Sequence, residues 1–164
     1  VYRKGTIGRA KDHLEATAFS ITDSLKDLDG QAYDSVNKAL VTQASSAIPV
    51  IPLYISILYK IMKEEGVHEG TIEQIQRLYQ DRLFTGKEVP TDEKGRIRID
   101  DWEMREDIQE KVAALWEKAT TENLSEIGDL EGYRKDFYNL FGFEIQGVDY
   151  KAEADEMVLV DSLK

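Results

Sequence analysis

The sequence predicts an α/β protein that is mostly helical in this segment and has two short strands. Apolar residues recur at three- and four-residue steps along about five segments, which is typical of amphipathic helices. The segments 32–37 and 96–99 are instead typical of short strands. Two isolated strands do not make a stable sheet. We therefore expect them to be the last members of a larger sheet whose other strands lie elsewhere.

The first two predicted helices flank the first strand. In the helix at 6–28, apolar residues such as Ile7, Leu14 and Ile21 recur at helical steps, and Asp29-Gly30 would end it. The second helix, at about 45–64, would be kinked near its start by two prolines, which cost little in a first turn. Its apolar run is too short for a membrane span, which needs roughly 20 apolar residues. A kinked apolar helix of this kind suits a wall that holds a cofactor at one end and an apolar substrate along its side.

The remaining helices follow a turn at His68. We expect an amphipathic helix at 71–84 with Ile72 and Ile75 on one side, and a helix at 103–119 that Asp100 or Asp101 could cap. A helical turn at 121–127 and a last helix at 129–140 complete the series. The sequence from Val148 is acidic and is expected to be loosely held.

Composition excludes several classes of protein. A chain of 164 residues favours one domain, and a net charge of −11 with a pI of about 4.7 disfavours nucleic acid and anionic membranes as partners. No cysteine is present, so thiolate catalysis and cysteine zinc sites are excluded, and cytoplasm is the expected compartment. His68 has no second histidine at ligand spacing, so we expect no metal. The start at Val1 suggests a fragment or a processed product.

Tyr2 and Lys11 form the first candidate catalytic pair. A lysine ammonium near a phenol lowers the pKa of the phenol, and such a pair can protonate or stabilise a developing enolate oxygen. On an unbroken helix the two would lie on opposite faces, so Tyr2 must precede the helix and the chain must fold back at Gly5 and Gly8. Taken alone, the spacing more often describes an exposed tyrosine and a solvated lysine.

The turn at Ala39, Leu40, Val41 and Thr42 is the second candidate site. It follows a predicted strand and precedes a helix, and ligands gather at such carboxyl ends in α/β sheets. A helix N-terminus at this place favours phosphate. The alternative is an ordinary connection in which Thr42 or Ser45 caps the helix. Aromatic residues such as Tyr54 are either core residues or part of an acyl pocket.

Several segments resemble the bacterial trans-2-enoyl-CoA reductases, including the FabV-type enoyl-acyl-carrier-protein reductases. They follow in unbroken order over nearly the whole chain: Gly5-Thr6-Ile7-Gly8-Arg9-Ala10-Lys11, 36–49, Pro52-Leu53-Tyr54-Ile55-Ser56, 98–103, 140–143 and 147–150. The resemblance implies a Rossmann-type fold related to the short-chain dehydrogenases. In that family a Tyr-x8-Lys motif is catalytic, and Tyr2 and Lys11 fall on it.

The resemblance also implies an activity. NADH would deliver hydride to the β-carbon of a trans-2-enoyl thioester of CoA or acyl carrier protein, in fatty acid synthesis. Tyr2 would stabilise or protonate the enolate, and Lys11 would hold the cofactor ribose. The turn would grip the cofactor through Ala39, Leu40, Val41 and Thr42, and the next helix would border the acyl pocket through Ile48, Ile51 and Ile55.

The resemblance covers only the C-terminal portion of the family. The family's N-terminal half, with its glycine-rich nucleotide loop and a second active-site tyrosine, is not found here, so it is the expected partner, within one polypeptide or as a separate chain. Residues 1–66 would end the Rossmann core and 67–164 would form a helical extension. The family's C-terminal region is sometimes described as flavin-binding, but these residues give no support for FAD. The alternative is a non-catalytic helical fragment that binds an acyl ligand or a partner chain.

Overall fold

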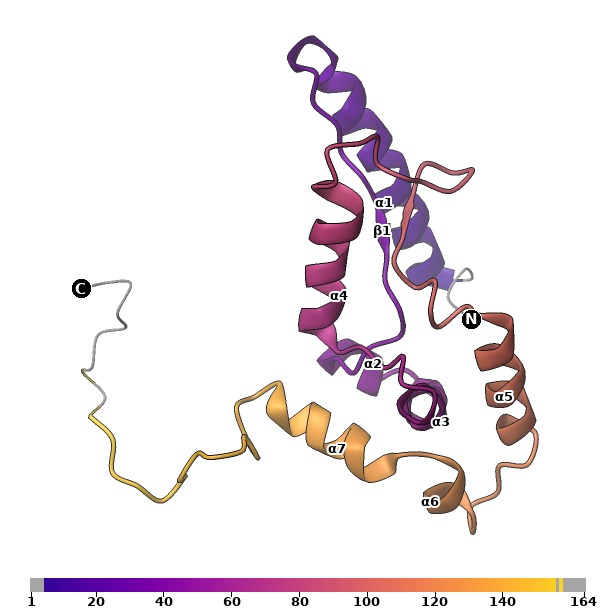
Figure 1. Ribbon diagram of the computed structural model, residues 1–164, viewed down its shortest axis with the longest axis vertical. Coiled ribbons are helices and arrows are strands. Elements are labelled where there is room, and N and C mark those ends of the chain that lie inside the picture. The colour runs from indigo at the N-terminus through magenta and orange to yellow at the C-terminus, as the bar shows by residue number, and fades with distance from the viewer. Residues whose placement is uncertain (1–4, 156, 158–164) are drawn as a thin grey trace.

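A computed structural model describes residues 5–155 and residue 157. Its helices and strands follow the predicted order (Figure 1). In sequence they are α1 (Gly5–Ser24), a 3-10 turn (Lys26–Leu28), β1 (Ser35–Val36), α2 (Gln43–Ser46), α3 (Ile51–Glu64), α4 (Thr71–Leu78), a π-helical turn (Tyr79–Leu83), β2 (Ile97–Arg98), α5 (Glu106–Trp116), α6 (Leu124–Ile127) and α7 (Leu130–Asn139). None of the described helices is long and apolar enough to cross a membrane.

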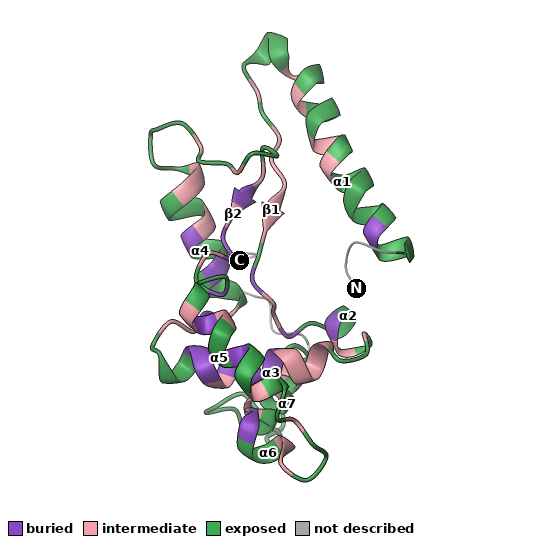
Figure 2. Ribbon diagram, turned by 90° about the vertical axis from the view of Figure 1, so that its right-hand side faces the viewer, coloured by how far each residue is buried: buried purple, intermediate pink, exposed green. Residues whose placement is uncertain are grey.

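The two predicted strands pair with each other in parallel. Ser35 is aligned with Ile97 and Val36 with Arg98, and the N–H of Ile99 donates to the carbonyl of Val36 at 3.0 Å. Helices α1 and α4 lie on opposite sides of this strand pair in both views (Figures 1 and 2). Parallel strands with helices on both sides are the arrangement of an α/β sheet. The fold is therefore a small part of an α/β architecture, as the sequence predicts.

Helix α3 lies at the centre of the apolar core. Its sequence from Ile51 to Met62 is almost continuously apolar, and a helix that is apolar on most sides is stable only when neighbours cover it. Helices α5 and α7 do so, and Figure 2 colours parts of the ribbon of α3 and α5 as buried. The fully buried members include Ile57, Leu58 and Met62 of α3 and Ile108 of α5.

The predicted helix at 45–64 is two helices rather than one kinked helix. Helix α2 ends at Ser46, and α3 begins at Ile51 with Pro52 in its first turn. Between them Val50 has a φ of +65°, a left-handed conformation that interrupts the helical path and is costly for a β-branched residue. Pro49 also disfavours helical geometry at Ile48, the residue before it, which is consistent with a full break here.

The apolar sides of α1 and α4 are largely exposed. Leu14 and Ile21 of α1 and Ile72 and Ile75 of α4 are all exposed, and Ile72 reaches 73%. Helix α4 instead buries its polar residues Gln74 and Arg77. The amphipathic pattern therefore does not decide which side of α4 is buried, because hydrogen bonds to buried acceptors orient this helix.

The predicted caps Asp100 and Asp101 were also wrong. Helix α5 begins only at Glu106, and both aspartates form ion pairs instead. Asp100 accepts two hydrogen bonds from the guanidinium of Arg98, at 2.8 and 2.6 Å. Asp101 accepts from Arg77 at 2.7 Å and from Arg82 at 2.9 Å. These pairs tie the segment after β2 to its neighbours.

Candidate active site

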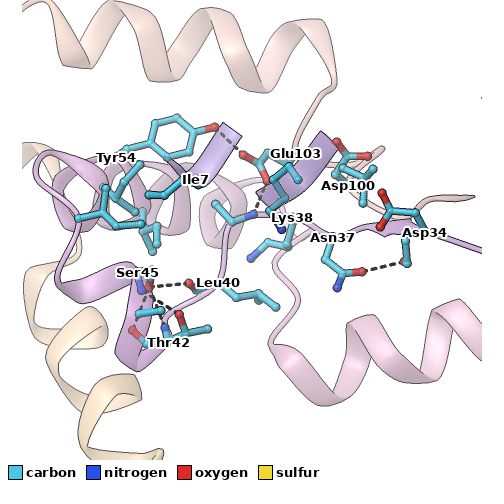
Figure 3. A pocket seen from close by; sticks show the side chains of 18 of the residues that line it. Ile7, Asp34, Asn37, Lys38, Leu40, Thr42, Ser45, Tyr54, Asp100 and Glu103 are labelled. Carbon is cyan, nitrogen blue, oxygen red and sulfur yellow. Dashed lines mark hydrogen bonds between the residues drawn. The ribbon is translucent and has the colours of Figure 1, made fainter. Parts of the chain in front are cut away.

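A cavity of about 890 Å³ lies beside the end of β1, between α1 and the α2–α3 segment (Figure 3). Three parts of the predicted site line it. Lys11 reaches it from α1, and the turn after β1 contributes Ala39, Leu40 and Thr42. The wall around the start of α3 contributes Ile48, Ile51 and Ile55. An apolar wall facing a polar turn is an arrangement that holds a ligand with one apolar and one polar part.

Two predicted site residues are not among the lining residues. Tyr2 lies outside the described residues. Val41 is 4% exposed, and its side chain packs in the apolar core rather than in the cavity. Tyr54, which sequence reasoning could not separate from the core aromatics, does line the cavity. Lys11 is exposed on α1 and lines the cavity.

Side chains hold the backbone of the turn after β1. Four of its N–H groups donate to side-chain oxygens: Lys38 to Gln74 Oε1 at 3.1 Å, Ala39 to Glu103 Oε2 at 2.6 Å, Val41 to the Tyr59 hydroxyl at 3.1 Å, and Thr42 to Ser45 Oγ at 2.9 Å. These partners belong to different elements of the chain. The conformation of the turn therefore depends on residues that are distant in sequence.

Thr42 and Ser45 form a reciprocal cap at the start of α2. The Thr42 hydroxyl accepts from the Ser45 N–H at 3.0 Å, and Ser45 Oγ accepts from the Thr42 N–H. The sequence left a capping role and a ligand-facing role open for Thr42. The cap is present, and Thr42 also lines the cavity, so the two roles are compatible.

Lys38 is buried beneath the turn, although a lysine is rarely buried without partners. It is 3% exposed, its Nζ donates to the Glu69 carbonyl at 2.8 Å, and it lies 4.1 Å from the centre of the Tyr59 ring. Burial lowers the pKa of Lys38 to about 8, against the opposing charges of Glu103 and Glu69. At neutral pH the lysine is therefore a buried cation close to the cavity.

A second buried cluster joins α4 to the segments around it. The Arg77 guanidinium donates to both carboxylate oxygens of Glu69, at 2.6 and 2.8 Å. Gln74 donates to Glu69 at 2.5 Å and to the Ile99 carbonyl at 3.0 Å. Such a bidentate pair is strong and directional. Sequence reasoning treated Glu69 as part of a turn and missed this cluster, because no local sequence pattern indicates that a polar side chain is buried.

Glu103 connects the turn to α3. Its Oε1 accepts a hydrogen bond from the Tyr54 hydroxyl at 2.6 Å, and its Oε2 accepts from the Ala39 N–H (Figure 3). Glu103 is 7% exposed. Burial and the Glu103 charge raise the pKa of Tyr54 above its usual range, so this phenol stays protonated. The sequence drew attention to Glu103 only within a family-like segment, although a carboxylate shortly after a predicted strand was a usable signal.

His68 lies beside the same cluster. Its ring packs edge-on against Tyr59 at 4.4 Å between ring centres, and its buried Nδ1 has no hydrogen-bond partner among the described residues. Burial, together with the positive charges of Lys38 and Lys63, lowers the pKa of His68 to about 4. The histidine is therefore neutral at physiological pH. Within the described part of the chain, no group of three acidic or histidine side chains could hold a metal ion.

Comparison with family models shows which family the chain belongs to. The model described as "Trans-2-enoyl-CoA reductase catalytic region" matches residues 1–84. The chain belongs to the trans-2-enoyl-CoA reductase family. A second model, described as "Enoyl reductase FAD binding domain", matches residues 91–154 of this reductase-family chain. The family predicted from the short sequence segments is confirmed.

Curated relatives agree with the family models. The chain is 79% identical over 164 residues to the enoyl-[acyl-carrier-protein] reductase [NADH] of Flavobacterium johnsoniae, covering 100% of this chain and 41% of the relative. It is 61% identical over 152 residues to the reductase of the same name from Coxiella burnetii, covering 92% of this chain and 37% of that protein. The chain thus spans about two fifths of the length of the curated relatives it matches.

Solved structures of the family share this fold. The trans-2-enoyl-CoA reductase of Clostridium acetobutulicum in complex with NAD matches with a TM-score of 0.89 and 47% identity, over 94% of this chain and 40% of that one. The enzyme of Treponema denticola, also in complex with NAD, matches with a TM-score of 0.85 and 55% identity, over 93% and 38%. The fold class predicted from the sequence is therefore confirmed.

The residues of the flavin-named region that reach the cavity do not fit a flavin there. They are Arg96, Asp100 and Glu103. Arg96 pairs with Asp92 and Glu15, and the two carboxylates already accept hydrogen bonds within the protein. These three residues therefore offer the cavity no free side-chain donor for a flavin. No step of the chemistry below is assigned to FAD.

Proposed function

We propose that this chain takes part in the NADH-dependent reduction of the 2,3 double bond of trans-2-enoyl thioesters, acting with the part of the family that it does not span. One observation carries the proposal. A single cavity is lined by Lys11, by the turn after β1 and by the apolar wall at Ile48, Ile51 and Ile55. The family resemblance assigns these three parts to catalysis, to cofactor binding and to binding of the acyl chain. Residues 1–66 would provide the catalytic part and 67–164 the helical extension.

Bound NADH would supply a hydride to the β-carbon of the substrate. The pair of electrons then moves onto the thioester oxygen, where Tyr2 would stabilise the enolate and provide a proton. Lys11 would bind the cofactor ribose, and its positive charge would favour the ionised form of the Tyr2 phenol. Lys11 lines the cavity from α1, so the cavity is the place where the pair would act.

The rest of the cavity would hold the two ligands in place. Ala39, Leu40 and Thr42 would contact the cofactor, with Val41 fixing the turn from the core side. Ile48, Ile51 and Ile55 would border the acyl chain, whose carrier is CoA or acyl carrier protein. The proposed setting is fatty acid synthesis in the bacterial cytoplasm, since the curated relatives are bacterial and carry names that refer to acyl carrier protein.

The test uses the full-length reductase that contains this chain, with NADH oxidation in the presence of a trans-2-enoyl-CoA as the readout. Tyr2→Phe should lower kcat by about 100-fold or more while the affinity for NADH is retained. Lys11→Ala should lower kcat and weaken NADH binding. Lys87→Ala, in an exposed loop, is the matched control and should change neither. Full turnover in Tyr2→Phe would overturn the catalytic assignment.

A non-catalytic fragment that binds an acyl ligand or a partner chain is the second candidate. The pairing of β1 with β2 favours it, because these strands find each other within the described residues. Two results together would support this candidate over the first. The 164-residue chain would bind a fatty acyl ligand, and NADH would not be oxidised after the rest of the enzyme is supplied.

A further inference from the structure

We propose that Glu103 is a positioning residue that sets the geometry of the cofactor turn and couples it to the acyl wall. The inference rests on the proposed function, because it concerns how that site is held. Glu103 lies in the part of the chain matched by the flavin-named model, yet its carboxylate points to the turn after β1. The region 91–154 would thus serve the nicotinamide site without binding a flavin.

The two carboxylate oxygens of Glu103 have separate partners. Oε2 holds the backbone N–H of Ala39 and Oε1 holds the hydroxyl of Tyr54, each at 2.6 Å. Both partners line the cavity, Ala39 from the turn and Tyr54 from α3. Figure 3 shows Glu103 between the Tyr54 hydroxyl and the backbone next to Lys38. One side chain therefore fixes the distance between the two walls.

The surroundings keep Glu103 in this position. Gln109 donates to the Glu103 carbonyl at 2.8 Å and to the Tyr54 oxygen at 3.3 Å, which anchors both ends of the contact to α5. The buried Lys38 cation balances the carboxylate charge. Because each carboxylate oxygen has its own donor, the side chain cannot move without breaking its contact to the turn or to α3.

Two conservative variants separate the effect of the side-chain length of Glu103 from the effect of its charge. Glu103→Asp keeps the charge but shortens the side chain by one carbon–carbon bond, about 1.5 Å, so it cannot hold both partners. Glu103→Gln keeps the reach and an oxygen acceptor for the Ala39 N–H, and its amide can donate to the Tyr54 oxygen, but it loses the charge. If Glu103 acts through position, Glu103→Asp must be the more damaging change.

The experiment measures KM for NADH and kcat in the full-length reductase. Glu103→Asp should raise KM for NADH about 10-fold, the factor expected when one hydrogen bond to a charged group is lost, with a smaller effect on kcat. Glu103→Gln should stay within about 3-fold of the parent because its geometry is retained. Tyr54→Phe removes one of the two contacts and should raise KM in the same direction by a smaller factor. Glu110→Asp, exposed on α5, is the matched control and should leave KM unchanged.

The outcomes distinguish this inference from the proposed function. A parent enzyme that does not oxidise NADH with an enoyl thioester contradicts the function itself. An active parent in which Glu103→Gln is as damaging as Glu103→Asp, or more so, overturns the positioning role. An active parent whose KM for NADH is unchanged in Glu103→Asp and Tyr54→Phe overturns it as well. Thermal unfolding of each variant confirms that the comparison is made between folded proteins.

Discussion

Around α3 the protein buries apolar side chains, whereas around α4 it buries charged ones. Leu58 and Met62 of α3 are completely covered by their neighbours. On α4 the covered side chains are Gln74 and Arg77, while Ile72 is exposed to solvent. Apolar burial is non-directional, but buried charges require partners at defined positions. Packing around α3 therefore stabilises the fold without fixing directions, whereas the buried charges around α4 fix the geometry beside the turn and depend on complete pairing.

The largest expected effect breaks the charged cluster. Arg77→Ala leaves Glu69, which is 4% exposed, without its bidentate partner. Removing one member of a buried ion pair costs about 3–5 kcal/mol in the free energy of unfolding, and urea unfolding of the 164-residue chain would measure it. Arg105→Ala, which removes a surface ion pair with Asp107, is the control and should leave stability unchanged. Equal stability of the two variants would show that the cluster is not a structural element.

The next effect addresses the apolar region. Leu58 is 0% exposed, so Leu58→Ala should lower the free energy of unfolding by about 2–5 kcal/mol through lost burial and a cavity. Leu14→Ala on α1 deletes the same atoms at an exposed position and should cost less than about 1 kcal/mol. A loss at Leu14 as large as that at Leu58 would mean that α1 is covered in the isolated chain.

Lowering the pH should reduce the stability of the folded state through His68, which packs against Tyr59 of α3. The pKa of His68 is lowered to about 4 by burial, Lys38 and Lys63, with Glu73 and Asp129 opposing, whereas the unfolded value is about 6.5. The unfolded chain then binds the proton more readily, so the folded state loses stability as pH falls from about 6.5 towards 4. The loss by pH 5 should be about 1–2 kcal/mol.

Unfolding by urea at pH 7 and pH 5 checks this expectation, with His68→Gln as the comparison. The variant lacks the titrating ring, so it should lose less stability than the parent over the same pH interval. An identical loss in both proteins would show that His68 does not contribute to the acid sensitivity.

The smallest effect concerns the exposed apolar face of α4. Ile72→Gln should change the stability of the 164-residue chain by less than about 0.5 kcal/mol, because Ile72 is 73% exposed. In the full-length reductase the same change should be more costly, since about 60% of the length of the Flavobacterium johnsoniae relative lies outside the part that this chain matches and could cover this helix. Equal changes in both proteins, measured by thermal unfolding, would argue that the face stays exposed.

Sequence patterns predicted the helices well and their orientation unevenly. The apolar run of α3 is stable only when it is buried, so its position in the core can be predicted from the sequence. Helix α4 offers both an apolar and a polar face, and the choice depends on Glu69 and the Ile99 carbonyl, which no local pattern reveals. The break at Val50 was predicted only as a kink, because a left-handed valine is an unusual solution.

The candidate site was predicted in the same uneven way. The lysine, the turn and the isoleucine wall came from a family resemblance, and the cavity joins their described members apart from Val41. Glu103 and Lys38 were missed because their importance comes from burial beside a turn that is distant in sequence. Spacing along the chain contains no information on such contacts, so only the three-dimensional arrangement identifies them.

Hydrogen–deuterium exchange of the 164-residue chain and of the full-length reductase is the most direct test of the contrast between the two regions. The account predicts that amides of α3 and α5 are protected in both proteins, because the core around α3 is complete. Amides of α1 and of 35–37 should gain strong protection only in the full-length enzyme, where we expect further strands to cover them. Equal protection of α1 and 35–37 in both proteins would contradict the account.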